Sequence, residues 1–138
     1  MAEGLEDDAR IVTFEVDDEL EDFTRRWIEG SEHASKVDFI IGDALEVVPT
    51  LGERFDMVFM DGNKREYIRY YELAMEYLND GGWILADNTL WDGHVIESGR
   101  QDAQTNGVRA FNDLVRGDDR VEVVMLPLRD GLTIIRKK

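Results

Sequence analysis

Two apolar runs of this chain each end on a carboxylate, and a lysine follows the first of them. The first run ends at Asp61, and Lys64 lies three residues later. The second run ends at Asp87, which is followed by Asn88. Both runs have the length and composition of buried strands. In an open α/β sheet, ligands bind outside the carboxyl ends of the strands, so these residues predict three oxygen donors and one amine at one sheet edge.

The chemistry of this group points to a divalent cation beside a proton-transfer site. Oxygen-only sites select Mg²⁺, Ca²⁺ or Mn²⁺ over zinc. A lysine beside a cation and away from water gives up its proton more readily, so Lys64 is a candidate general base. The alternatives are capping and turn formation by the Asp and Asn side chains, and a surface charge for Lys64. The repeated pattern at two strand ends favours metal or ligand binding.

A second group of candidates follows two earlier predicted strands. Glu15 lies near the end of the first, where a carboxylate can accept hydrogen bonds from both hydroxyls of a ribose. Alone, it is more readily explained as a solvated loop residue. Gly42, Asp43 and Ala44 end the neighbouring strand. Gly42 would let a flat ligand approach the backbone, and Asp43 would accept from an exocyclic amine or cap the next helix, two roles that are compatible.

The loop after Asn88 carries two candidate substrate contacts. Trp91 follows closely, and it either walls a substrate pocket or simply packs. His94 lies in the same loop, where the alternative to a substrate contact is a solvated side chain.

Strand and helix patterns alternate along the chain, which implies βαβ units and an α/β fold with a mostly parallel sheet. No linker or composition shift divides it, so we expect one domain over residues 1–138. An Asp-Gly pair between the last two apolar segments predicts a closing antiparallel hairpin. The predicted strands cover 10–16, 37–41, 55–60, 83–87, 121–126 and 132–135, and the predicted helices cover 18–29, 45–51, 65–78 and the region 108–115 before Gly117.

Composition narrows the class of protein. With 43% hydrophobic and 34% charged residues, the chain is typical of a soluble globular protein. Its net charge of −15 argues against a nucleic-acid binder. The absence of cysteine excludes disulfides, thiolate metal sites and a cysteine nucleophile. No apolar run nears the roughly 20 residues that cross a bilayer, and the acidic start lacks signal-peptide features, so we expect a cytoplasmic protein without a membrane partner.

Four segments together resemble one family, the cation-dependent O-methyltransferases of the catechol and caffeoyl-CoA type, which use S-adenosylmethionine (SAM). The combination of Asp-x-x-Lys with Asp-Asn-x-Leu-Trp is specific, whereas Glu15 and the Gly-Asp-Ala signal are common to many methyltransferases. The resemblance extends over nearly the whole chain and implies a Rossmann-like methyltransferase sheet. The segments are 55–64, 70–72, 81–82 and 87–93.

The resemblance implies a role for each residue of the first group. Asp61, Asp87 and Asn88 would hold Mg²⁺, which would bind the acceptor hydroxyl and lower its pKa. Lys64 would then take the proton. The acceptor would be a small hydroxylated, catechol-like aromatic molecule, with Trp91 and His94 near it.

For the cofactor, the resemblance implies that Glu15 holds the SAM ribose. Asp43 and Ala44 would lie at the adenine, with Gly42 beside them and Asp61 also at the cofactor. The family's usual Asp-Ala-Asp-Lys differs here only at its second and third positions, residues 62 and 63.

The N-terminus departs from the family pattern. Family members carry a glycine-rich loop that holds the methionine end of SAM, and none precedes Glu15. We therefore expect a sheet shortened at its N-terminus, completed by a homodimer or strand exchange. The alternative function is a non-catalytic methyltransferase-fold domain that acts as a binding module. A nicotinamide-dependent oxidoreductase is less favoured, because no G-x-G-x-x-G is present.

Overall fold

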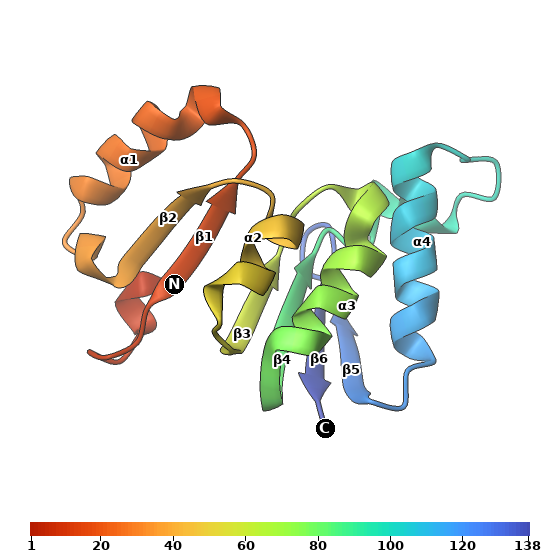
Figure 1. Cartoon of the computed structure of the whole chain (residues 1–138). Helices are drawn as coiled ribbons and strands as arrows, with labels where there is room; N and C mark the ends of the chain where they lie inside the picture. Colours follow the sequence, from red (N-terminus) through yellow and green to blue (C-terminus); the bar gives the residue numbers. More distant parts are fainter. The chain divides into compact units, whose positions relative to one another are not determined.

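The chain divides into two units, and the first, Met1–Leu51, contains a sheet of two parallel strands. The computed structural model describes residues 1–138. Five residue pairs join strand β1 to strand β2, from Ile11↔Val37 to Glu15↔Ile41. The elements of this unit are η1 (Ala2–Gly4), β1 (Ile11–Glu15), η2 (Asp18–Leu20), α1 (Glu21–Glu29), η3 (Ala34–Lys36), β2 (Val37–Ile41) and α2 (Ala44–Leu51) (Figure 1).

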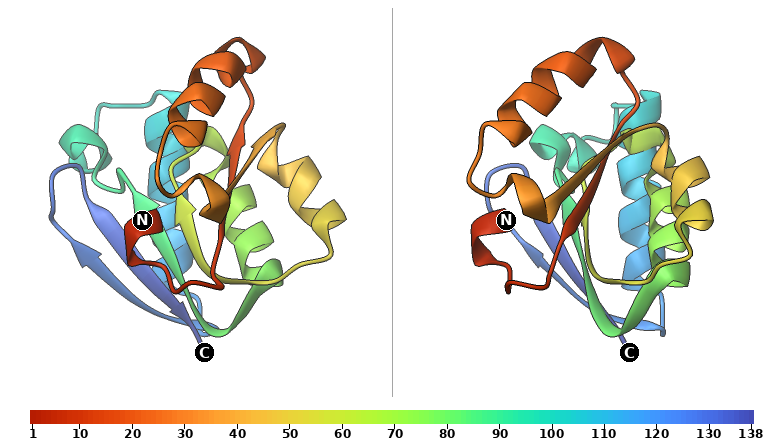
Figure 2. Two further views of the ribbon diagram at one scale, coloured as in Figure 1. Left: turned by 90° about the vertical axis from the view of Figure 1, so that its left-hand side faces the viewer. Right: turned by 60° about the vertical axis from the view of Figure 1, so that its left-hand side comes forward.

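The second unit, Gly52–Lys138, holds a four-stranded sheet in the order β3-β4-β6-β5. Strands β3 and β4 are parallel, and β6 is antiparallel to both β4 and β5. Figure 2 shows β5 and β6 as a hairpin beside β4. The elements are β3 (Phe55–Met60), η4 (Lys64–Glu66), α3 (Tyr67–Tyr77), β4 (Leu78–Asp87), η5 (Trp91–Ile96), α4 (Ala103–Arg116), β5 (Val121–Leu126) and β6 (Leu132–Lys137).

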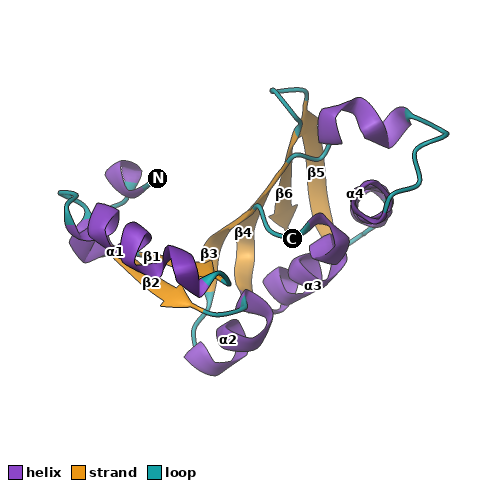
Figure 3. Cartoon of the chain, turned by 90° about the horizontal axis from the view of Figure 1, so that it is seen from above, coloured by secondary structure: helices purple, strands orange, loops and turns teal.

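Helices α3 and α4 cover the same face of the four-stranded sheet (Figure 3). They meet it through one buried apolar cluster, whose centre is aromatic. The ring of Phe111 lies edge-on to Tyr67 and Tyr71, with centroids 5.3 and 6.0 Å apart. This geometry adds to the free energy gained from burying the rings. The cluster comprises Met60, Tyr67, Tyr71, Ala74, Met75, Leu78, Ile84, Ala86, Phe111, Val115, Val121 and Ile135.

The predicted α/β class and the closing antiparallel hairpin are confirmed. The strands form two hydrogen-bonded sheets, in the orders β1-β2 and β3-β4-β6-β5. The single domain predicted over residues 1–138 stays a prediction, as does the homodimer. None of the helices combines the length and apolar character needed to span a bilayer.

Several element boundaries differ from the sequence prediction. Strand β4 begins at Leu78, so residues 79–82 belong to the strand and not to a turn before it. Leu78 pairs with Phe55, and a register shift follows on β3 before Met57 pairs with Trp83. The double glycine lies in this irregular stretch of the pairing. At the start of the first helical segment, predicted over 18–29, the Asp17 side chain caps η2 by accepting from the Glu19 amide.

Candidate functional site

Lys64 is the only buried residue with a charged side chain in this structure. It opens η4 directly after β3, where the Asn63 side chain accepts from the Arg65 amide. The Lys64 Nζ donates to Asp61 Oδ1 over 2.9 Å and to the Tyr67 hydroxyl. A buried ammonium is costly unless it is paired and hydrogen-bonded, and both conditions hold here.

Helix α4 closes over this lysine because residue 107 is glycine. A Cβ at Gly107 would collide with the Lys64 carbonyl oxygen and would lie 3.0 Å from the Arg65 Cα. On the other side, the Lys64 Nζ lies 4.4 Å from the Tyr67 ring centroid and 5.9 Å from that of Trp91. Both distances are within cation–π range. Lys64 is thus enclosed by backbone, by a carboxylate and by two aromatic rings.

Tyr67 links the ends of the two parallel strands of this unit. Its fully buried hydroxyl accepts from Lys64 and donates to the Asp87 carbonyl oxygen over 2.8 Å. Burial, and then the negative charges of Asp61, Asp87 and Asp130, raise the pKa of Tyr67 far above its ordinary value. The hydroxyl therefore keeps its proton and can serve as donor and acceptor at once.

The segment after β4 has an unusual backbone. Asn88, Trp91 and Asp92 have φ values of 58°, 49° and 54°, in the left-handed region that non-glycine residues rarely adopt. Such conformations persist where surrounding contacts enforce them, and they cluster at functional sites. Here the amides of Thr89 and Leu90 donate to carbonyl oxygens of Gly131 and Asp130, in the β5–β6 turn. The Asp92 amide donates to the Asp130 carboxylate.

In the first unit, Glu15 and Gly42 lie side by side at the ends of β1 and β2. The Gly42 amide donates to the Glu15 carbonyl oxygen over 2.8 Å. Gly42 has φ 153°, and a Cβ there would lie 2.9 Å from Val47 Cγ2. Asp43 Oδ1 accepts from the Leu45 amide over 2.9 Å, which is the N-cap role weighed for it. Ala44 is the first residue of α2.

The structure therefore brings together Asp61, Lys64 and the backbone of Asp87, with Trp91 beside the lysine. His94 Nδ1 lies 3.0 Å from Glu97 Oε1, so the His94 imidazole is paired within its own loop. Tyr67, which lies in the predicted helix 65–78, was not among the predicted site residues. Its signal was the spacing: Tyr67 lies one helical turn after Lys64.

The predicted cation ligands do not form a cluster of acidic or imidazole side chains. No group of three or more His, Cys, Asp or Glu residues is arranged as a metal site. The predicted set is different in kind, because it joins two carboxylates, Asp61 and Asp87, to the amide of Asn88. The Asp61 side chain is half exposed, so one of its oxygens is open to a ligand while the other holds Lys64. This all-oxygen set fits a hard divalent cation in its chemistry.

Comparison with known proteins places the chain in a family. The family described as O-methyltransferase matches residues 1–138. The chain belongs to the O-methyltransferase family. Tricin synthase 2 of Oryza sativa subsp. japonica is 35% identical over 147 residues, with 97% of this chain and 50% of that protein covered. Caffeoyl-CoA O-methyltransferase 1 of Eucalyptus globulus is 34% identical, with 97% and 59% covered.

Among solved structures, the O-methyltransferase TomG from Streptomyces achromogenes, in complex with SAM, matches with a TM-score of 0.90 and 28% identity. That match covers 99% of this chain and 66% of TomG. The chain spans about half the length of the curated relatives it matches. The resemblance stated from the sequence motifs is thus confirmed at the level of the family.

Proposed function

We propose that this chain carries the catalytic residues of a SAM-dependent O-methyltransferase that uses a divalent cation and a small, catechol-like acceptor. One observation carries the proposal: the buried Lys64, held by Asp61 and by Tyr67, lies where the ends of two parallel strands are joined. A buried, paired lysine at that place has a ready explanation in proton transfer. Family membership supplies the reaction class, transfer of a methyl group to oxygen.

In this proposal, Asp61, Asp87 and Asn88 hold Mg²⁺, with Ca²⁺ or Mn²⁺ as the alternatives. When bound, such a cation lowers the pKa of a coordinated hydroxyl. The chain itself supplies hard oxygen ligands and keeps them near the base Lys64. Two contacts support this, the ion pair of Asp61 with Lys64 and the hydrogen bond of Tyr67 to the Asp87 carbonyl oxygen.

In its neutral amine form, Lys64 receives the proton of the acceptor hydroxyl on its Nζ. The oxygen lone pair then attacks the methyl carbon of SAM, and the bond between that carbon and the sulfonium sulfur breaks. The hydrogen bonds from Lys64 to Asp61 and Tyr67 fix the amine, so it need not be reoriented during the reaction. Trp91 and His94 contact the acceptor, and the place of the Trp91 ring near Lys64 supports the first of these roles.

SAM is held by Glu15, Gly42, Asp43 and Ala44 of the first unit. The SAM-bound relative TomG supports the choice of cofactor. Because the Asp43 carboxylate accepts one backbone amide through Oδ1, its other oxygen is left for an adenine amine.

The first test is a calorimetric titration of SAM into the purified chain, with and without Mg²⁺. We expect binding in the micromolar range, followed by methyl transfer when a panel of catechols and other phenols is added. SAM binding without transfer to any acceptor would favour the non-catalytic alternative. No SAM binding by a chain that circular dichroism shows to be folded would contradict the proposal for this chain.

A further inference from the structure

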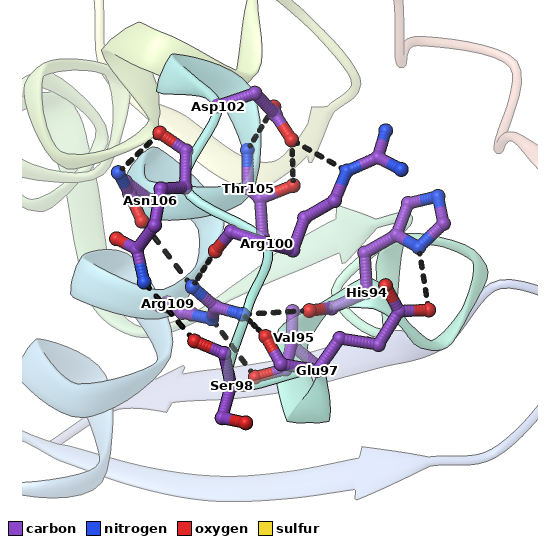
Figure 4. Close-up of polar contacts among 10 residues, drawn as sticks. His94, Val95, Glu97, Ser98, Arg100, Asp102, Thr105, Asn106 and Arg109 are labelled. Atoms are coloured by element: carbon purple, nitrogen blue, oxygen red, sulfur yellow. Dashed lines mark hydrogen bonds and ion pairs between the residues drawn. The ribbon is translucent and has the colours of Figure 1, made fainter.

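A polar stripe on helix α4 faces the segment that leads from β4 into that helix. Its members recur at helical spacing, so they share one side of α4. Each makes a hydrogen bond to residues 89–102, as Figure 4 shows for all but the last of them. They are Thr105, Asn106, Arg109 and Asn112, with the N-cap Asp102 before them.

Arg109 is the centre of this stripe, because each of its five N–H donors has an acceptor. Its Nε donates to the Val95 carbonyl oxygen over 2.9 Å. Its Nη2 donates to the carbonyl oxygens of His94 and Glu97 over 2.8 and 2.5 Å. Its Nη1 donates to the Arg100 carbonyl oxygen over 2.6 Å and to the Asn106 side chain. The guanidinium therefore holds four carbonyl groups of one loop (Figure 4).

Further contacts hold both ends of this loop against α4. Asn112 donates to the Thr89 carbonyl oxygen over 2.8 Å at the start of the loop. At its end, Asp102 accepts from the Thr105 amide and hydroxyl, and also from Arg100 Nε over 2.7 Å. Between these ends no strand or α-helix stabilises the loop, and Ile96 is 86% exposed. The shape of the middle of the loop therefore depends on the Arg109 guanidinium.

We propose that Arg109 is a positioning residue for acceptor recognition. It holds residues 94–100 and the adjoining Trp91 in the conformation that contacts the acceptor. This inference rests on the proposed function, because the proposed function makes that loop one side of the acceptor-binding site. Arg109 cannot itself bind an acceptor, since all five of its donors are already used inside the chain. Lysine would be a poor substitute, because one ammonium cannot reproduce a planar fork that spans four carbonyl groups.

The first measurement needs no activity and concerns the loop alone. Arg109→Met keeps an unbranched apolar stem and removes the donors, and Arg109→Lys is the milder variant, chosen to fold if the first does not. Arg116→Met is the matched control, because Arg116 lies on the same helix with its side chain 81% exposed. By hydrogen exchange and mass spectrometry, we expect peptides covering 91–100 to exchange at least about tenfold faster in the Arg109 variants and unchanged in the control. Unchanged exchange in both Arg109 variants would overturn the inference.

The second measurement asks whether the loop serves recognition or only stability. Catechol is titrated calorimetrically in the presence of Mg²⁺, and SAM is titrated separately. We expect the Arg109 variants to bind catechol about 10- to 100-fold more weakly, because small misplacements of a binding wall have effects of this size, while SAM affinity is unchanged. Faster loop exchange with unchanged catechol affinity would reduce Arg109 to a structural residue and overturn the inference. If the wild type binds no catechol, the proposed acceptor class fails, and this inference fails with it.

Discussion

The two units support their candidate residues in very different ways. In Gly52–Lys138, the residues around Lys64 stand on a sheet and two helices that share one buried aromatic cluster. In Met1–Leu51, Val48 is the only buried residue, and helix α1 leaves Phe23 and Trp27 exposed at 61% and 69%. A two-stranded sheet is only marginally stable by itself. The metal and proton-transfer residues are thus held rigidly, whereas the cofactor residues rest on a lightly packed unit.

The largest expected effect is on kcat, and it should distinguish the catalytic role of the second unit from the cofactor-binding role of the first. We predict that Lys64→Met lowers kcat by about 10²- to 10⁴-fold, the usual contribution of a general base. Glu15→Ala is predicted instead to raise the SAM dissociation constant and to leave kcat at saturating SAM nearly unchanged. Methyl-transfer kinetics with a catechol acceptor and SAM calorimetry measure the two effects.

Arg65→Met is the matched control for this prediction, because Arg65 is the exposed neighbour of Lys64 in η4. Its kcat should stay within about twofold of the wild type, well below the effect of losing a general base. Equal kcat values for the Lys64 and Arg65 variants would remove the proposed base. A fall in kcat for Glu15→Ala as large as that for Lys64→Met would erase the division of roles between the units.

The second prediction compares an aromatic side chain from each unit by its contribution to stability. Phe111→Ala removes the ring that packs edge-on against Tyr67 and Tyr71, and we expect it to cost about 3–5 kcal/mol. Phe23→Ala removes an exposed ring and should change the free energy of unfolding by no more than about 0.5 kcal/mol. Urea unfolding followed by circular dichroism measures both. A cost above about 2 kcal/mol for Phe23→Ala would show that α1 is packed more tightly than its exposure indicates.

The sequence was sufficient for the parts of the site that depend on local pattern. Asp61 directly follows β3 and Asp87 is the last residue of β4, as their apolar runs predicted, and the two strands are parallel neighbours. Asp43 caps a helix, as its place before an apolar turn allowed. These features follow from residue type and spacing within a few residues, which is what a sequence displays.

Other parts could not be predicted, because they depend on contacts between distant residues. Tyr67 lies in the predicted helix 65–78, but its hydroxyl bonds to Asp87, 20 residues away. Arg109 holds carbonyl groups 9 to 15 residues before it, along a loop whose path no pattern encodes. The start of β4 at Leu78 shows the same effect, since pairing with Phe55 overrides the turn signal of the double glycine.

A third prediction, with a smaller expected change in the free energy of unfolding, concerns how firmly the loop after Asn88 is held by the second unit. The hydroxyls of Thr89 and Thr133 are buried and lie 2.8 Å apart. Thr133→Val leaves the Thr89 hydroxyl without this partner, so we expect a cost of about 1–3 kcal/mol. Thr89→Val with Thr133→Val should cost less than the sum of the two single changes, because both polar groups are then removed together.

A double-mutant cycle by urea unfolding gives the coupling between the two threonines. We expect a coupling of at least about 0.5 kcal/mol, the range found for residues in direct contact. Strict additivity would mean that the two hydroxyls find other partners, and that the loop is less firmly joined to β6 than the structure indicates.

The smallest effect concerns the pH dependence of the second unit. Asp118 accepts hydrogen bonds from Arg120 and from Tyr71, and Arg120 also pairs with Glu72. These bonds, those from Arg120 foremost, lower the pKa of Asp118 from 3.8 to about 2. A carboxyl whose pKa is lower in the folded state stabilises the fold above its unfolded pKa. That contribution is lost as the pH falls from 3.8 towards about 2.

We therefore predict that Asp118→Asn lowers the stability at pH 7, and that the difference from wild type shrinks as the pH falls from 3.8 to about 2. Urea midpoints across this range measure it, with Asp113→Asn, an exposed carboxylate in α4, as the control. A difference that stays constant with pH would trace the effect to packing and not to charge. Asp118 follows α4 and accepts from Tyr71 of α3, and its partner Arg120 pairs with Glu72 of α3. A pH-dependent loss would therefore show that α3 and α4, which enclose Lys64, are held together partly by these charged contacts.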